Sequence, residues 1–292
     1  MTGEILALCS AMLYGIAGVT ISKGKKDATG DNGVFLSVVA TCVLTVGLWL
    51  IWGGVSLSQL ASWDSAPGLA LFALAGIFST VLGRTTMYRA TERIGAVKAA
   101  LFRRLIPVFA LPCGLMLLGE WPEAHVLVGG AIIMAGVLCY QLLPCHLSIT
   151  QNLTGDLFGI ASALCYALAY SFRRMGLDGI PDPLFGTLFG AVMGLVWFPL
   201  VAAFRGGAFR HLFCDRCVWH WATALSLGIG QTLQFLALSM APVSSVAILG
   251  TLDLFFSAAF IALFFKGERF DGRLLALAGG LAFLGSAILF SQ

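Results

Sequence analysis

The sequence predicts an all-α polytopic membrane protein whose ten transmembrane helices form two inverted repeats of five. Hydrophobic residues make up 59% and charged residues 11% of the 292-residue chain, against roughly 45–50% and 25% in soluble proteins. The apolar residues fall into membrane-length stretches, and the first stretch recurs in the second half. A soluble fold needs a larger polar surface, and a net charge of +3 gives no basic surface for nucleic acid.

Glycine, proline and charge clusters bound the predicted helices. A spanning helix needs about 20 mostly apolar residues. On that criterion the helices lie at 4–22, 33–53, 68–90, 96–118, 123–144, 155–175, 183–204, 219–240, 243–265 and 272–290. Neighbouring helices almost meet at Glu92–Gly95 and at Ala241–Pro242. We read the first helix as a retained span, because it carries Glu4 where a signal peptide has basic residues.

The distribution of Lys and Arg predicts the orientation. Fifteen of the seventeen fall on one side of the predicted bundle, and only Arg173 and Arg174, in the last turn of the sixth helix, fall on the other. Basic loops face the cytoplasm. We therefore expect an integral protein of a bacterial inner (plasma) membrane with both termini outside.

The two halves of the chain are similar in sequence. Residues 2–24 align without gaps with residues 154–176, and Gly119-Glu120 recurs as Gly267-Glu268. Chance similarity between apolar helices is the alternative, but two matches in the same order favour duplication. The units, 1–146 and 147–292, each hold five helices. An odd number inverts the second copy in the membrane, as in secondary transporters.

Short motifs in both halves resemble the EamA-type exporters of the drug/metabolite transporter superfamily. The motifs are Leu105-Ile-Pro107-Val, Leu118-Gly-Glu120, Ala237-Leu-Ser-Met-Ala-Pro-Val243, Leu252-Asp253-Leu and Gly267-Glu268. The resemblance implies that helices 1–4 and 6–9 surround a central cavity, with helices 5 and 10 as peripheral supports. It also implies export of small metabolites, amino acids or drugs.

Charged residues inside the predicted helices are the first candidates for the transport path. Each costs at least about 2.5–3.5 kcal/mol near the bilayer centre. We expect Asp253 to be an ion-pair partner, a ligand of a substrate amine or a titrating group; a structural ion pair with Arg103 or Arg104 is the alternative. Successive helical residues point about 100° apart, so one of these arginines should face the cavity and the other lipid or a neighbouring helix. Arg84 is the next candidate.

The arginines favour a substrate with carboxylates. Arginines at a cavity mouth that only balance the charge of the membrane surface would give the same sequence pattern.

Uncharged polar residues and two prolines complete the predicted path. Tyr14 and Tyr166, each one turn after a serine (Ser10 and Ser162), and the pair Gln231 and Gln234 either line the cavity or join helices. Pro107 and Pro112 interrupt the backbone hydrogen bonds of the fourth helix. They either let this helix bend during transport or form static kinks in it.

One loop has metal-like spacing, His211-x-x-Cys214-x-x-Cys217-x-x-His220. Its outer spacings differ from those of ordinary zinc fingers, so we expect a solvated loop here, with no bound metal or other cofactor.

These observations predict a secondary-active transporter that exports amino acids or carboxylate-bearing amino-acid derivatives, opine-type metallophores included, by alternating access. Proton antiport through Asp253 and facilitated diffusion both remain open. The alternative is a multidrug or nucleotide-sugar/organic-anion carrier of the same fold. A membrane-embedded enzyme is disfavoured, since no His-Glu-x-x-His or Gly-x-Ser-x-Gly motif is present, and no Walker loop indicates ATP-driven pumping. Expected partners are the lipid bilayer, a small-molecule substrate and protons, without nucleic acid, in a monomer or homodimer.

Overall fold

The computed structural model describes residues 2–61, 63–142, 152–204, 209–264 and 272–290, and every regular element in these ranges is a helix. The elements are α1 (Thr2–Gly24), α2 (Val34–Trp52), α3 (Leu57–Leu60), η1 (Trp63–Ser65), α4 (Ala66–Gly76), η2 (Ile77–Gly83), α5 (Arg84–Arg103), α6 (Ile106–Leu118), α7 (Ala124–Leu142), α8 (Leu153–Gly179), α9 (Pro183–Phe204), α10 (Phe209–Phe213), α11 (Val218–Met240), α12 (Val243–Gly250), α13 (Asp253–Phe264) and α14 (Gly272–Phe290). The repeated Gly267-Glu268 lies outside the described residues.

Six helices in the described ranges are long and apolar enough to cross a membrane. They are Thr2–Gly24, Val34–Trp52, Ala66–Ala90, Leu153–Gly179, Pro183–Phe204 and Val243–Ile261. Shorter apolar helices cover Ile106–Leu118, Ala124–Gly136 and Gly279–Leu289. The chain is therefore an all-α integral membrane protein, as its composition predicts.

The boundary predicted at Glu92–Gly95 is wrong. Helix α5 continues through these residues to Arg103, and the interruption falls at Arg104 and Leu105. Pro107 explains the position of this interruption, because it lies in the first turn of α6. The backbone N–H that proline lacks would have no partner within the helix at this position. Glu92–Gly95 contains no proline, and one glycine only weakens a helix.

The predicted helix 243–265 is likewise divided. Helix α12 ends at Gly250, α13 begins at Asp253, and Thr251 and Leu252 lie between them. Since the break frees backbone carbonyl groups in the middle of this segment, other side chains can bind there. The predicted sixth helix is longer than expected, because α8 continues to Gly179.

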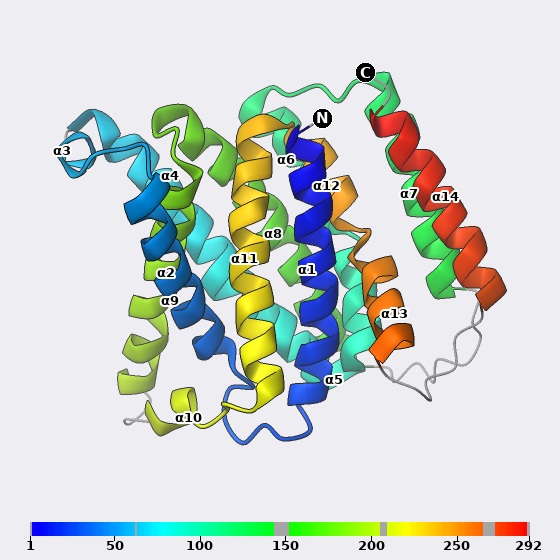
Figure 1. Ribbon diagram of the computed structural model, residues 1–292, viewed down its shortest axis with the longest axis horizontal. Helices are drawn as coiled ribbons and strands as arrows, with labels where there is room; N and C mark the ends of the chain where they lie inside the picture. Colours follow the sequence, from blue (N-terminus) through cyan, green and yellow to red (C-terminus); the bar gives the residue numbers. More distant parts are fainter. Residues whose placement is uncertain (1, 62, 143–151, 205–208, 265–271, 291–292) are drawn as a thin grey trace.

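The long helices stand side by side, and α7 and α14 form a separate pair at one edge (Figure 1). These two helices approach closely where glycines meet: a Cβ added to Gly129 would lie 2.7 Å from the carbonyl oxygen of Gly285. Small residues permit such close helix packing in membranes. Figure 1 also places both ends of the chain at the same end of the bundle.

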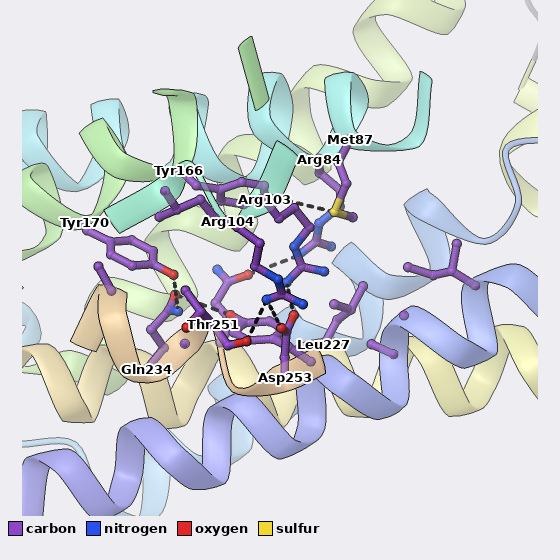
Figure 2. Close-up of a pocket in the computed structure, with 18 of the residues that line it drawn as sticks. Arg84, Met87, Arg103, Arg104, Tyr166, Tyr170, Leu227, Gln234, Thr251 and Asp253 are labelled. Atoms are coloured by element: carbon purple, nitrogen blue, oxygen red, sulfur yellow. Dashed lines mark hydrogen bonds and ion pairs between the residues drawn. The ribbon is translucent and has the colours of Figure 1, made fainter. Parts of the chain in front are cut away.

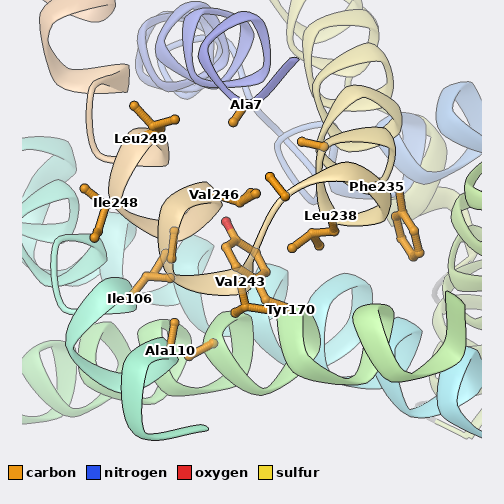
Figure 3. Packing of buried hydrophobic residues seen from close by; sticks show 14 of the residues in the cluster. Ala7, Ile106, Ala110, Tyr170, Phe235, Leu238, Val243, Val246, Ile248 and Leu249 are labelled. Atoms are coloured by element: carbon orange, nitrogen blue, oxygen red, sulfur yellow. The ribbon is translucent and has the colours of Figure 1, made fainter. Parts of the chain in front are cut away.

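A cluster of buried apolar residues lies between α1, α6, α8, α11 and α12 (Figure 3). It includes Ala7, Ala110, Leu238, Val243 and Val246, all 2% exposed or less. Glu120 adds a polar contact at this end, where its Oε2 accepts the N–H of Val243 at 3.1 Å. The bundle is therefore tightly packed between its centre and the end that carries the termini.

Candidate functional site

A cavity lies at the centre of the bundle, lined by α1, α5, α8, α11, α12, the first residues of α6 and α13, and the turns that precede these two helices (Figure 2). The centres of water molecules can occupy about 50 Å³ of it. One water needs roughly 10–15 Å³ on this measure, so the cavity is contracted around its own side chains. Four arginines and one aspartate contribute the charged groups among its described lining residues.

Asp253 binds two arginines at the centre of the cavity. Arg103 Nη2 lies 2.9 Å from Asp253 Oδ2, while Arg104 Nη1 bonds to Asp253 Oδ1. Arg104 Nη1 also donates to the carbonyl oxygen of Thr251 at 2.8 Å. Of the two arginines, Arg104 is fully buried and Arg103 has a side chain 21% exposed. The cluster therefore joins the break between α5 and α6 to the break between α12 and α13 (Figure 2).

The expectation that only one of Arg103 and Arg104 faces the cavity is wrong, because both line it and both reach Asp253. The 100° rule assumes a continuous helix, whereas α5 ends at Arg103 and Arg104 lies in the turn before α6. The turn directs both side chains to one carboxylate. Asp253 opens α13, so it follows directly after the second break.

The expectation that Arg173 lies in the last turn of the sixth helix is also wrong, because α8 continues to Gly179. Arg173 lies well inside α8, lines the cavity and is 2% exposed. Its Nη1 donates to Gln234 Oε1 at 2.6 Å, and Gln234 Nε2 donates to the hydroxyl of Tyr170 at 2.6 Å. Arg84 lines the cavity as predicted and donates to Gln231 Oε1 at 3.0 Å.

The tyrosines and serines of the two repeated segments separate into two roles. Tyr14 and Tyr166 line the cavity. Ser10 and Ser162 instead hydrogen-bond to backbone carbonyl groups, Ser10 to Gly230 at 2.8 Å and Ser162 to Gly83 at 3.0 Å. The serines therefore join helices, whereas the tyrosine rings face the space where a ligand would lie.

The two prolines differ in position. Pro107 begins α6, whereas Pro112 lies inside this helix. A proline inside a helix removes one backbone hydrogen bond and bends the axis. Ile106, directly before Pro107, lines the cavity, so a change of angle at this break would move one wall of the site.

The loop with metal-like spacing forms hydrogen bonds within itself and a contact with Asn32. His220 Nδ1 accepts from the N–H of Cys217, and its Nε2 lies 3.2 Å from Asn32 Oδ1. Cys214 Sγ lies 2.9 Å from the carbonyl oxygen of Arg210, and His211 lies in α10. Among the residues that the structure describes, no group of three or more His, Cys, Asp or Glu could hold a metal ion.

Asp215, in the same loop, fastens the connection between α1 and α2. Its carboxylate accepts the backbone N–H groups of Thr29, Gly30 and Asn32 at 2.6–3.1 Å. Burial opposes ionisation of this carboxyl, but the three hydrogen bonds outweigh burial and hold its pKa below the usual value. The loop thus has a structural role, to which His220 of the metal-like pattern contributes through its contact with Asn32.

Tyr170 and Arg173 are cavity residues that were not among the predicted site residues. With Tyr166 they follow the spacing i, i+4, i+7, which places all three on one face of α8. That spacing is visible in the sequence and could have identified them. Thr251 could not have been found this way, because it enters the site through its backbone carbonyl.

Comparisons with known proteins agree with this architecture. Residues 1–141 match the EamA-like transporter family. A solved structure titled only "Crystal structure of protein" shares the fold, with a TM-score of 0.72 and 15% sequence identity over 99% of this chain and 95% of that one. No curated protein matches the sequence. The match to residues 1–141 agrees with the resemblance seen in the sequence motifs: this part of the chain is a domain of the EamA-like transporter family, within the drug/metabolite transporter superfamily.

Proposed function

We propose that the protein is a secondary-active transporter that exports amino acids or carboxylate-bearing amino-acid derivatives by alternating access. The charge of the central cavity carries this proposal. Arg84, Arg104 and Arg173 are each 4% exposed or less, and Asp253 offsets only one positive charge in the described lining. Guanidinium groups bind carboxylates through paired, charge-assisted hydrogen bonds.

The burial of these arginines favours substrate binding over a role in balancing the membrane surface. Arginines that serve the surface extend their charged ends into the headgroup region, whereas Arg84 and Arg173 contact glutamines at the centre of the bundle. A charge enclosed in this way is costly unless an opposite charge accompanies it. An anionic substrate would supply that charge.

Two inverted units, 1–146 and 147–292, would give such a cavity its alternating access. Pairs of contacts with corresponding partners support this arrangement. Ser10 of α1 bonds to Gly230 of α11, and Ser162 of α8 bonds to Gly83, directly before α5. The two serines lie 152 residues apart in the sequence, and the two glycines that they contact lie 147 residues apart. These similar spacings are expected if the two contacts correspond to each other in a duplicated chain.

The proposed cycle begins with the bundle closed at the end that carries the termini. There the apolar cluster of Figure 3 and the contact between Glu120 and Val243 lie between the cavity and the surface. Export would require this packing to separate while the opposite end closes. The breaks at Arg104–Leu105 and Thr251–Leu252 are suitable hinges, because they already interrupt helical hydrogen bonding.

An organic-anion carrier is the second candidate. The surplus positive charge of the cavity would also suit other anions, including the diphosphate of a nucleotide sugar. A multidrug carrier of apolar cations is less compatible with three uncompensated positive charges among the described lining residues. Phosphate-bearing ligands therefore belong in the test beside amino acids.

The test is efflux from proteoliposomes that contain the purified full-length protein. Vesicles are loaded with labelled amino acids, carboxylate-bearing derivatives or a nucleotide sugar, a pH gradient is imposed, and release is followed. We expect saturable release of one or more carboxylate-bearing compounds. No saturable release of any amino acid or derivative would overturn the amino-acid proposal, and release of the nucleotide sugar alone would favour the organic-anion carrier.

Asp253→Asn tests proton coupling in the same vesicles. If Asp253 carries the proton, the variant loses the dependence of release on the pH gradient. Equal release with unchanged pH dependence would exclude Asp253 as the proton carrier, and absence of any gradient dependence in the wild type would indicate facilitated diffusion.

A further inference from the structure

Two cavity arginines have no acidic partner among the described residues. Arg84 donates to Ser37 Oγ at 2.7 Å and to Gln231 Oε1 at 3.0 Å. Arg173 donates to Gln234 Oε1 at 2.6 Å. They are 4% and 2% exposed, respectively. Neutral groups therefore hold both guanidinium groups in place and leave their positive charges uncompensated.

The glutamines bring these two charges near one another. Gln231 and Gln234 are three residues apart in α11, so they lie on one face and about 4.5 Å apart along the helix axis. An amide oxygen accepts a hydrogen bond as a carboxylate would, but it carries no charge. Arg84 and Arg173 are thus oriented without being neutralised.

Two hydrogen-bond donors among these arginines and glutamines are unused in the part of the chain that the structure describes. Arg173 Nε and Gln231 Nε2 are buried, belong to residues that line the cavity, and have no hydrogen-bond partner among the described residues. Buried donors are nearly always satisfied. Two unused donors, one on the Arg173 guanidinium group and one on the Gln231 amide, together with two uncompensated positive charges, are complementary to a carboxylate.

The other arginine pair differs in having an acidic partner, although Arg104 Nε is likewise buried without a hydrogen-bond partner among the described residues. Arg103 and Arg104 share the carboxylate of Asp253, so their site already contains one anionic group from the protein. The cavity therefore has two arginine clusters of the same chemical kind, one occupied by a carboxylate of the chain and one that lacks any acidic partner among the described residues.

We infer that Arg84 and Arg173 form a second anion subsite and that the transported metabolite carries two carboxylates. This inference rests on the proposed transport function. One carboxylate binds Arg84 and Arg173, and the other replaces Asp253 on Arg103 and Arg104. A zwitterion with a single carboxylate brings no net charge, whereas a dicarboxylate offsets two of the three surplus positive charges of the described lining.

The test measures binding, with chemically matched probes. The purified full-length protein in lipid nanodiscs is titrated calorimetrically with malonate, succinate and glutarate, and with the monoamide of each, at constant ionic strength. A monoamide keeps the size of its parent but has one carboxylate. We expect at least one dicarboxylate to bind about tenfold or more tightly than its monoamide, as for the loss of one charge-assisted contact.

Single substitutions test whether these residues form the second anion subsite. Gln234→Glu supplies Arg173 with an internal carboxylate, so it should reduce the preference for the dicarboxylate to about twofold or less, and Arg173→Gln should do the same. Arg174→Gln is the matched control, since Arg174 lies on the same helix but outside the cavity lining and pairs with Glu120; it should keep the preference. Size-exclusion profiles and melting temperatures establish that each variant is folded.

Three outcomes would overturn the inference: binding of none of the dicarboxylates, equal binding of a dicarboxylate and its monoamide, or a preference that Gln234→Glu and Arg173→Gln leave unchanged. Its failure is distinguishable from failure of the proposed function. A dicarboxylate preference that requires Arg173, without flux in proteoliposomes, would support the subsite and contradict transport. Flux of monocarboxylate amino acids without this preference would support transport and contradict the subsite.

Discussion

Arg103 Nη2 lies 2.9 Å from Asp253 Oδ2 across the centre of the bundle. Arg104 binds the other oxygen of the same carboxylate, so a single acid connects the breaks of two interrupted helical segments. A substrate carboxylate would compete with Asp253 for the same guanidinium groups. Under the proposed function, substrate binding would therefore be coupled to the relative position of α6 and α13 through one side chain.

Asp253→Asn should destabilise the protein. The variant leaves two guanidinium groups near the centre of the bundle without their anion, which in buried pairs costs about 3 kcal/mol. The double variant Arg104→Gln/Asp253→Asn should lose less than the single variant, because it removes one of the uncompensated charges. Thermal unfolding in detergent, followed by circular dichroism, measures both. A single variant as stable as the wild type would show that the cluster does not stabilise the fold.

Gly129→Val should separate α7 from α14. A Cβ at Gly129 would lie 2.7 Å from the carbonyl oxygen of Gly285, and overpacking of this kind costs about 1–3 kcal/mol. Gly279→Ala is the control, since a Cβ on this glycine of α14 meets nothing within 4 Å. The melting temperature should fall for the first variant and stay near the wild-type value for the second. Equal melting temperatures would contradict the observed packing.

Asp215 should make the stability of the loop contact depend on pH. Its pKa is lowered in the folded protein, so its contribution is fully present above the unfolded value of about 3.9 and is lost as pH falls through the lower folded value. Asp215→Asn should therefore be less stable than the wild type at pH 7, by about 2 kcal/mol, and the difference should shrink below about pH 4. Chemical denaturation at pH 7 and pH 3 measures it, and a difference independent of pH would contradict the account.

Much of the fold could be predicted from composition and apolar length alone. Bilayer thickness fixes the length of a spanning helix, so Thr2–Gly24 and Val34–Trp52 lie close to their predicted bounds. The interruption at Arg104–Leu105 does not follow from the sequence pattern, because the glycine and charges at Glu92–Gly95 predict a boundary there while Pro107 begins the next helix. A proline in an apolar run is compatible with a helix start and with a kink, and the sequence pattern does not distinguish them.

The candidate site could be predicted in part. Asp253, Arg84, Tyr14 and Tyr166 were found because polar groups in apolar helices are costly, and all four line the cavity. The predicted helix 155–175 places Arg173 at its end, whereas α8 continues to Gly179 and holds Arg173 in its interior. The sharing of Asp253 by two consecutive arginines depends on a local break in the helix, which periodicity cannot describe.

Orientation in the membrane can be tested with single cysteines at exposed positions. If both termini face outward, Ser58→Cys should react with an impermeant maleimide added to intact cells, and Lys26→Cys should react only after the membrane is permeabilised. Cys9 and Cys214 are exposed, so both replacements are made in a background without native cysteines. Labelling of Lys26→Cys, but not Ser58→Cys, in intact cells would reverse the predicted orientation.

The most direct test of a cationic cavity that carries carboxylates compares two arginine variants in proteoliposomes. Arg104→Gln removes a cavity arginine that binds Asp253, and Arg174→Gln removes an arginine outside the cavity lining that pairs with Glu120. The account predicts that the initial rate of saturable efflux of a carboxylate-bearing metabolite falls about tenfold or more in Arg104→Gln and stays within about twofold of wild type in Arg174→Gln. Equal rates in the two variants would contradict it.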